Sequence, residues 1–381
     1  MKRREAVATK LTDQLCVLAR EAGAADGASG GSAGPAAGGP AVLADRPDGT
    51  VVGLGAVVAK AHPPAAGDQG DHGHQGDHGD ERPADAEQLT VRLGIAAHPR
   101  LAGILLPPLA AATSGVPRPR RLPGGRLATL WPRGTPVSPD APDDAPWEAA
   151  GVLLARLHAV PVEDLAGELP GAVPVMRGPA KAARAMRRLR AARGGGSGGA
   201  TDTTASGLAP ALAEAAEAVE GAWALLPAWC RAEESPPAAR AGILCHGDFH
   251  LGQLVSHPPS EGSWQLIDVD DLGVGDPAWD LARPAAWYAA GLLPSADWER
   301  FLGAYQHAAG APCRDPWQHL DAPARALTTQ TAALAVVKAH AARRPLDEAE
   351  AACVEACVRM ADVDRTSTTC TTATGGRCAN A

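Results

Sequence analysis

The sequence predicts an α+β protein with two lobes, a small β-rich lobe followed by a larger, mostly helical lobe. Three observations lead to this prediction. Short apolar runs separated by turn residues fill positions 41–60, which is typical of β-hairpins. From Trp147 onward, apolar residues recur at helical spacing. A chain of 381 residues is long for one hydrophobic core and more readily forms two.

Composition limits the classes of function. The formal charge of −8 argues against nucleic acid as the main partner, because phosphate backbones select basic surfaces. No apolar run reaches the roughly 18 residues of a membrane helix, and the basic start lacks the apolar stretch of a signal peptide. Eight cysteines without CxxC pairs predict reduced thiols. We therefore expect a cytoplasmic protein that has neither a membrane nor a nucleic acid as partner.

Four regions are expected along the chain. They are an N-terminal helix with a flexible Gly/Ala-rich segment (1–40), the small lobe (41–134), the helical lobe (135–364) and a disordered tail (365–381). Residues 62–82 interrupt the small lobe with a repeat that contains His72, His74 and His78. These histidines could bind a transition metal, but the composition favours a disordered insertion with adventitious binding.

The elements of the small lobe follow from its apolar runs and turns. The turn Pro47-Asp48-Gly49 and a second turn at 53–55 separate three expected strands, the last of which ends in Lys60. A helix is expected from Pro83 to about Ala97. Further strands are expected at 104–106 and 127–131, with the inter-lobe hinge at 131–134.

The helical lobe begins with an apolar stripe, Trp147, Ala150, Leu154 and Leu157, that predicts a helix ending near Pro161. A basic segment, 177–193, follows. Its cations could hold an anionic substrate. The pattern favours instead the solvated face of an amphipathic helix.

The most informative stretch is His246-Gly247-Asp248-Phe249-His250-Leu251-Gly252-Gln253, which is followed fifteen residues later by Asp268. It provides a carboxylate that can accept a proton, Asp248, and an amide that can bind a metal ion, Gln253. A hairpin-sized spacer then leads to Asp268, which could bind the same metal. Phosphoryl transfer needs these groups, because the enzyme must position a hydroxyl and hold Mg²⁺. Asp270 points the same way as Asp268 if the strand continues, so it is a candidate second ligand.

This stretch resembles the protein-kinase catalytic loop, His-Arg-Asp with an Asn five residues after the Asp. Gly247 in place of Arg is similar to the aminoglycoside phosphotransferase and choline-kinase-like branch of that superfamily. The segment Gly275-Asp276-Pro277-Ala278-Trp279-Asp280-Leu281-Ala282 resembles the same branch, and Gln253 resembles maltokinase-like relatives. The structural alternative is that these carboxylates are turn and cap residues, as Asp beside Gly or Pro usually is. The conjunction of motifs favours the resemblance.

The resemblance implies a protein-kinase-like bilobal fold and a kinase that phosphorylates a hydroxyl of a small molecule, such as an aminoglycoside, sugar or amino alcohol. ATP or GTP would donate the phosphoryl group with the assistance of Mg²⁺. The implied roles are proton acceptor for Asp248, nucleotide binding for Lys60, Leu130 and Trp131, metal binding for Gln253, Asp268 and Asp270, and bracing of the catalytic loop for Asp280.

One weak match leaves a second class of function open. Kinases anchor the nucleotide lysine with a helix Glu, and here the expected helix offers only Asp85 and Glu87. The alternative is therefore a nucleotide-binding pseudokinase that acts as an interaction module, although intact Asp248 and Asp268 speak against it. The sequence identifies neither the acceptor nor acidic groups that would bind a polycationic antibiotic, and it leaves ATP or GTP and the oligomeric state open.

Overall fold

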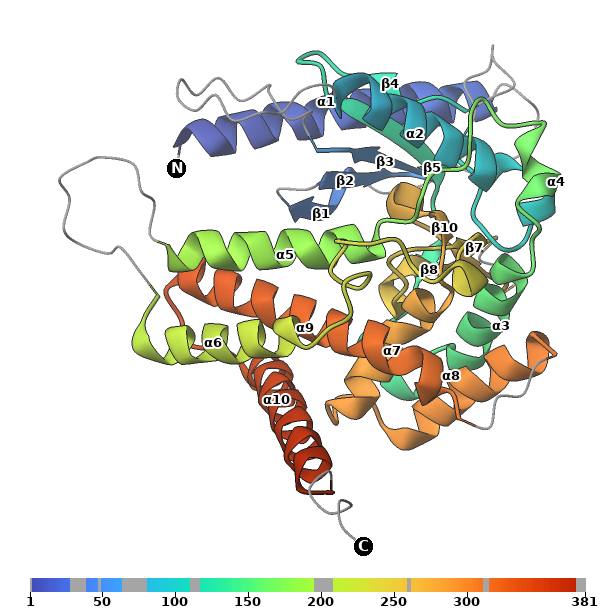
Figure 1. Cartoon of the computed structure of the whole chain (residues 1–381). Coiled ribbons are helices and arrows are strands. Elements are labelled where there is room, and N and C mark those ends of the chain that lie inside the picture. The colour runs from blue at the N-terminus through green and yellow to red at the C-terminus, as the bar shows by residue number, and fades with distance from the viewer. Residues whose placement is uncertain are drawn as a thin grey trace, which may run out of the picture. The chain divides into compact units, whose positions relative to one another are not determined.

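A computed structural model describes residues 2–27, 39–46, 49–63, 81–109, 117–194, 208–258, 262–310 and 315–374. The chain divides into two compact units (Figure 1). Unit 1 comprises Met1–Pro146, Ala159–Val175 and Leu251–Gly273, and unit 2 comprises Trp147–His158, Met176–His250 and Val274–Ala381. The four regions expected from the sequence, with a division at 134/135, stay a prediction.

Unit 1 is built on a five-stranded antiparallel sheet with the strand order β1-β2-β3-β5-β4. The strands are β1 (Ala41–Arg46), β2 (Gly49–Leu54), β3 (Val57–Ala61), β4 (Arg120–Arg121) and β5 (Leu127–Pro132). Lys60 lies inside β3, opposite Val51 of β2 and Thr129 of β5. The three successive strands expected from the apolar runs are therefore present, and the predicted lysine lies within the third.

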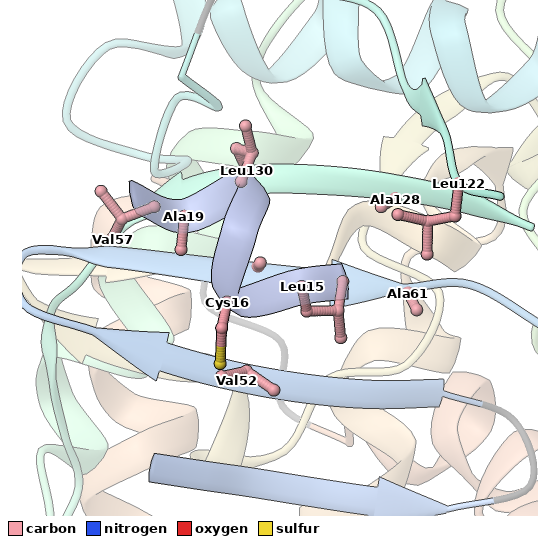
Figure 2. Packing of buried hydrophobic residues seen from close by; sticks show 10 residues of the cluster. Leu15, Cys16, Ala19, Val52, Val57, Ala61, Leu122, Ala128 and Leu130 are labelled. Carbon is pink, nitrogen blue, oxygen red and sulfur yellow. The ribbon is translucent and has the colours of Figure 1, made fainter. Parts of the chain in front are cut away.

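Helix α1 (Lys2–Gly27) covers one face of this sheet and contacts β2, β3 and β5. Figure 2 shows Leu15, Cys16 and Ala19 of α1 among the apolar side chains of the strands. The strand residues of this cluster are Val52, Val57, Ala59, Ala61, Ala128 and Leu130, and Leu122, which follows β4, joins them. Since this face of the sheet is buried beneath α1, the N-terminal helix is part of the core of unit 1.

A second, three-stranded sheet in unit 1 carries the spacer between the two halves of the motif. Its strands, in the order β6-β8-β9, are β6 (Thr135–Pro136), β8 (Leu254–Ser256) and β9 (Trp264–Leu266). The strand expected at 104–106 is wrong, because this segment forms only an isolated parallel bridge between Leu105 and Leu266. Its backbone is nonetheless satisfied, since Leu106 N–H donates to Leu266 O and Leu266 N–H donates to Ile104 O.

The other helices of unit 1 are short apart from α2, which runs from Glu81 to Ala97 and so matches the helix expected from Pro83. They are η1 (Pro99–Leu101), η2 (Pro142–Asp144), α4 (Glu163–Ala166), η4 (Leu251–Gln253) and η5 (Val269–Asp271). Residues 64–80, which hold the histidines of the expected insertion, lie outside the described residues.

Unit 2 is mostly helical. Its helices are α3 (Trp147–His158), α5 (Gly178–Arg193), α6 (Pro210–Ala224), η3 (Ala238–Arg240), α7 (Ala278–Ala289), α8 (Ser295–Ala308), α9 (Trp317–Ala342) and α10 (Glu348–Thr374). A two-stranded sheet pairs β7 (Ile243–Cys245) with β10 (Gly273–Gly275). Helix α9 packs against α5, α6, α7 and α10, so it forms the centre of the bundle.

An aromatic cluster in unit 2 fixes the start of the functional loop. Phe249, which follows Asp248 directly, is buried and stacks on Phe301 of α8 with ring centroids 5.7 Å apart. Trp147 of α3 meets Phe301 edge-on at 5.9 Å. Such pairs stabilise beyond their buried area, and here they hold Asp248 against the bundle.

The predicted α+β architecture, a small antiparallel sheet with a larger helical part, is confirmed. Helix α10 continues to Thr374, so the expected tail 365–381 begins as helix, and its remainder lies outside the described residues. No helix among the described residues has the length and apolar character needed to span a membrane.

Leu15→Ala tests whether α1 belongs to the core of unit 1. The Leu15 side chain is fully buried on the sheet, so its truncation should lower the free energy of unfolding by about 2–5 kcal/mol. Val17→Ala on the same helix is the matched control, because Val17 is 49% exposed and should change stability by about 0.5 kcal/mol or less. Urea unfolding with hydrogen exchange of the β2 and β3 amides measures both. Equal stability of the two variants would contradict the packing of α1.

Candidate functional site

Unit 1 holds an ion-pair cluster at Lys60. The ammonium nitrogen Nζ lies 2.6 Å from Asp268 Oδ1 and 2.9 Å from Asp270 Oδ2. Burial alone would lower the pKa of Lys60, but the two carboxylates outweigh burial and hold the pKa above its ordinary value. Lys60 therefore keeps its positive charge, and the carboxylates of Asp268 and Asp270, which follow β9, hold its ammonium group in place.

Asp270 extends this cluster into the five-stranded sheet. Its Oδ2 also lies 3.2 Å from His62 Nδ1, and His62 Nε2 lies 3.0 Å from Thr129 Oγ1. Burial would raise the pKa of Asp270, but Lys60 and His62 hold it well below the ordinary value. The side chain of Asp270 thus contacts Lys60 of β3 and His62, the residue that follows β3, and His62 in turn contacts Thr129 of β5.

The backbone reaches Asp270 by a route that the sequence did not predict. Asp270 was expected to point the same way as Asp268 if the strand continued, but β9 ends at Leu266. Asp268 adopts the left-handed conformation with φ 65°, and residues 269–271 form the short helix η5. Both carboxylates meet Lys60 because the chain turns sharply at Asp268, a conformation that Asp tolerates better than most residues.

Gln253 and Asp268 lie side by side, as the hairpin-sized spacer predicted. Strands β8 and β9 pair antiparallel, and Ile267 N–H donates to Gln253 O at 2.9 Å just beyond them. The side-chain amide nitrogen of Gln253 is 3.5 Å from Asp268 Oδ2. A half-turn of this amide exchanges nitrogen for oxygen. A carboxylate and an amide oxygen are the hard donors that Mg²⁺ prefers, so these residues fit that ion.

Helix α2 does not supply the expected acidic partner of Lys60 from the residues that can be described. Glu87 is exposed, and the side chain of Asp85 lies outside the described part. Instead α2 presents Arg92, whose side chain is buried and whose Nε donates to Leu272 O at 2.8 Å. Helix α2 therefore contacts the segment beyond Asp270 through a cation. Local sequence carried no signal of this exchange.

Leu130 and Trp131, which were predicted to bind the nucleotide together with Lys60, lie in β5. Leu130 is buried in the cluster beneath α1, and its carbonyl accepts from Leu109 N–H at 2.8 Å. Trp131 is buried as well, and its indole N–H donates to Thr129 Oγ1 at 3.0 Å. Trp131 thereby joins the hydrogen-bonded chain that runs from Asp270 through His62, whereas the Leu130 side chain packs in the core.

Unit 2 holds the loop that carries Asp248. Gly247 has φ 83°, a left-handed conformation that favours glycine. The buried carboxylate of Asp280 accepts from His246 N–H at 2.6 Å and from Gly247 N–H at 2.7 Å. His158 Nε2 lies 3.0 Å from the same carboxylate. The prediction that Asp280 braces the loop is confirmed.

Asp248 itself is held by two cations of unit 2. Its Oδ2 lies 2.6 Å from Lys181 Nζ, and its Oδ1 accepts from Arg283 Nη2 at 2.7 Å. Burial would raise the pKa of Asp248, but Lys181 and then Arg283 lower it below the ordinary value. Both oxygens of this carboxylate are therefore engaged by positive charge.

Neither cation was predicted as a site residue. Lys181 belongs to the basic segment that was assigned to a solvated helix face, and only the fold brings it to Asp248. Arg283 did carry a signal, because it lies three residues after Asp280 on the same helix. Residues three apart share a helix face, so a residue beside the loop brace was a candidate for contact with the loop.

A buried group near the brace has the composition of a metal site. Ligand atoms of His158, Cys245 and Asp280 all lie within 4.8 Å of one another. The Asp280 oxygens already accept the loop N–H groups, and Cys245 Sγ lies 3.4 Å from Ile243 O. Burial raises the pKa of the Cys245 thiol well above its ordinary value, which disfavours the thiolate that binds metals. We interpret this group as structural.

Comparison with known proteins identifies the family. Residues 95–326 match the model of the phosphotransferase enzyme family (APH), and no curated protein matches the sequence. Because the match covers more than half of the chain, the chain belongs to this family. It is a phosphotransferase.

Several solved structures are similar to this chain. A choline/ethanolamine kinase family protein from Mesorhizobium loti is 16% identical, with 86% of this chain and 88% of that chain covered and a TM-score of 0.42. A macrolide 2'-phosphotransferase from Brachybacterium faecium is 19% identical, with 82% and 88% covered and a TM-score of 0.39. The GDP complex of aminoglycoside 2'-phosphotransferase-IIIa is 14% identical, with 86% and 93% covered and a TM-score of 0.46.

Asp280→Asn tests the brace of the Asp248 loop. The amide cannot accept from both His246 N–H and Gly247 N–H, so one buried donor loses its partner. We expect the free energy of unfolding to fall by about 1–3 kcal/mol and exchange of the loop amides to accelerate. Asp321→Asn in α9 is the control, because Asp321 is 60% exposed. Unchanged loop exchange in Asp280→Asn, measured by mass spectrometry, would contradict the bracing role.

Proposed function

We propose that this protein is a kinase that transfers the terminal phosphoryl group of ATP or GTP to a hydroxyl of a small molecule, such as an aminoglycoside, sugar or amino alcohol. The observation that carries the proposal is the contact of Lys60 with Asp268, two residues 208 positions apart, with Gln253 beside Asp268. Turn or cap carboxylates need only local partners. A long-range pairing of the predicted phosphate cation with the predicted metal carboxylate instead supports nucleotide chemistry.

The nucleotide half of the reaction is assigned to unit 1. Lys60 supplies a point charge for nucleotide phosphates, as a lysine ammonium group can. Asp268 and Gln253 would hold Mg²⁺, which when bound neutralises charge on the phosphates. Asp270 holds Lys60 together with His62, so we assign it as the anchor of the lysine in place of a helix Glu.

The acceptor half is assigned to Asp248 in unit 2. A carboxylate at this position orients the attacking hydroxyl and accepts its proton as the new bond to phosphorus forms. The fixed loop supports this role, since Asp280 holds the two backbone N–H groups before Asp248 and Phe249 is anchored after it. Rigid placement of a reacting group saves orientational entropy.

The pseudokinase alternative rested on the uncertain match of a helix acid to Lys60. Since Lys60 has Asp268 and Asp270 as acidic partners, a pairing with a Glu of α2 is not needed to hold its charge. A cytoplasmic location stays a prediction.

Asp248→Asn separates an enzyme from a binding module. The substitution keeps the shape of the side chain but removes the proton acceptor, so we expect turnover to fall by about 10²–10⁴-fold with nucleotide affinity nearly unchanged. A coupled ADP-release assay over a panel of hydroxyl acceptors measures turnover, and the slow hydrolysis of ATP by water stands in for the acceptor reaction if no acceptor is found. Gln253→Asn keeps an amide oxygen and should retain measurable activity. Parent-like turnover of Asp248→Asn would remove the catalytic assignment.

A further inference from the structure

We propose that the acceptor carries an anionic group, a carboxylate or a phosphate, and that Lys181 and Arg283 bind this group beside Asp248. This inference rests on the proposed kinase function and narrows its substrate class. It favours hydroxy acids, sugar acids or sugar phosphates over aminoglycosides and amino alcohols.

The geometry of the cluster supports an anion site. Lys181 comes from α5 and Arg283 from α7, and both helices pack against α9, so two separate helices of the bundle hold the two cations. Their side chains are 25% and 16% exposed, and that of Asp248 is 20% exposed. The cluster is thus half-buried, which strengthens its electrostatics, and it still reaches solvent, which lets a ligand in.

Charge balance points the same way. Lys181 and Arg283 bring two positive charges to the one carboxylate of Asp248. Helix α5 adds to this field, because it contains no acidic residue and exposes Arg184, Arg187 and Arg188. A cluster with excess charge of one sign attracts ligands of the other sign. A polycationic acceptor would meet repulsion at the point where its hydroxyl must approach Asp248.

The engagement of both Asp248 oxygens explains why the acceptor needs its own anion. A carboxylate that is paired at Oδ1 and at Oδ2 is a weak proton acceptor. An anionic group of the acceptor competes for Lys181 or Arg283 and so releases one oxygen of Asp248. The hydroxyl proton then passes to that oxygen, the acceptor oxygen bonds to phosphorus, and the bond from phosphorus to the nucleoside diphosphate breaks.

A matched set of polyols tests the inference. Gluconate, glucitol and glucamine differ chiefly in the charge at one end of the same carbon chain, as do glycerate, glycerol and aminopropanediol. We expect the anionic member of at least one series to exceed its neutral and cationic partners in kcat/KM. Lys181→Met should lower that kcat/KM by about 10–100-fold, the range for a lost hydrogen bond to a charged group. The KM for ATP should stay near the parent value, because the nucleotide half of the reaction is assigned to Lys60 and Asp268 of unit 1.

Two variants of the same helix complete the test. Lys181→Arg keeps the charge and should keep the preference for the anionic member. Arg187→Met removes the same charge from an exposed position of α5, about 120° around the helix from Lys181, and should leave the preference unchanged. Arg187 has no part in the proposed site. Comparison of Arg187→Met with Lys181→Met therefore distinguishes a direct contact with the acceptor from the general positive potential of the helix.

Several outcomes would overturn the inference. A higher kcat/KM for the neutral or cationic members would do so. The same holds if no anionic member raises ADP release above the rate of ATP hydrolysis by water. An equal loss with every acceptor in Lys181→Met, accompanied by a raised KM for ATP, would show that the cations serve the nucleotide phosphate instead. A different result would contradict the kinase proposal itself: the rate of ATP hydrolysis would then be the same in Asp248→Asn as in the parent protein.

Discussion

The functional carboxylates of this chain are each held by positive charge or by backbone N–H groups within their own unit, and the rest of the site depends on this pairing. Asp268 and Asp270 hold Lys60, Asp248 is held between Lys181 and Arg283, and Asp280 accepts two loop N–H groups. An unpaired charge in a buried position is costly. Removal of one partner of a buried pair typically costs about 3–5 kcal/mol, since it leaves the other charge uncompensated. The pairing therefore fixes the positions of these side chains without any ligand.

In the function that we propose, a charged ligand can displace one partner of each pair. Nucleotide phosphates would compete with Asp268 for Lys60, and a divalent cation would compete with Lys60 for Asp268. In the anion site that we propose, an anion on the acceptor would compete with Asp248 for Lys181. Each exchange replaces one ion pair with another, so a ligand whose charge is opposite to that of the group it binds leaves no buried ion unpaired. A ligand of the same charge as that group would break an ion pair without forming a new one.

Local features of the site were predictable from the sequence. Alternating apolar runs and turns predicted the strands around Lys60, and the spacer length predicted that Gln253 and Asp268 would meet. The stripe from Trp147 predicted α3. These features depend on chain periodicity and on hairpin geometry, which act over a few residues.

Features that depend on contacts between distant segments were not predictable. Lys181 lies on a helix whose composition favours a solvated face, and only tertiary packing turns it towards Asp248. The sequence placed Asp270 on the same side as Asp268 only if the strand continued, and the strand ends before both residues. Asp270 reaches Lys60 because Asp268 adopts a left-handed conformation. Segment 104–106 has a strand-like composition, yet no neighbouring strand pairs along its length. Pairing partners, rather than local propensity, decided each of these cases.

Calorimetry of ATP binding with and without Mg²⁺, on Asp268→Asn and Asp270→Asn, tests the central claim that these two carboxylates have different tasks. Asp268→Asn should lose the dependence of ATP affinity on Mg²⁺, because the metal carboxylate is gone. Asp270→Asn should keep that dependence and bind ATP more weakly at every Mg²⁺ concentration, because Lys60 has lost its anchor. Equal ATP affinity with and without Mg²⁺ in the parent protein, or loss of the dependence in both variants alike, would contradict this division.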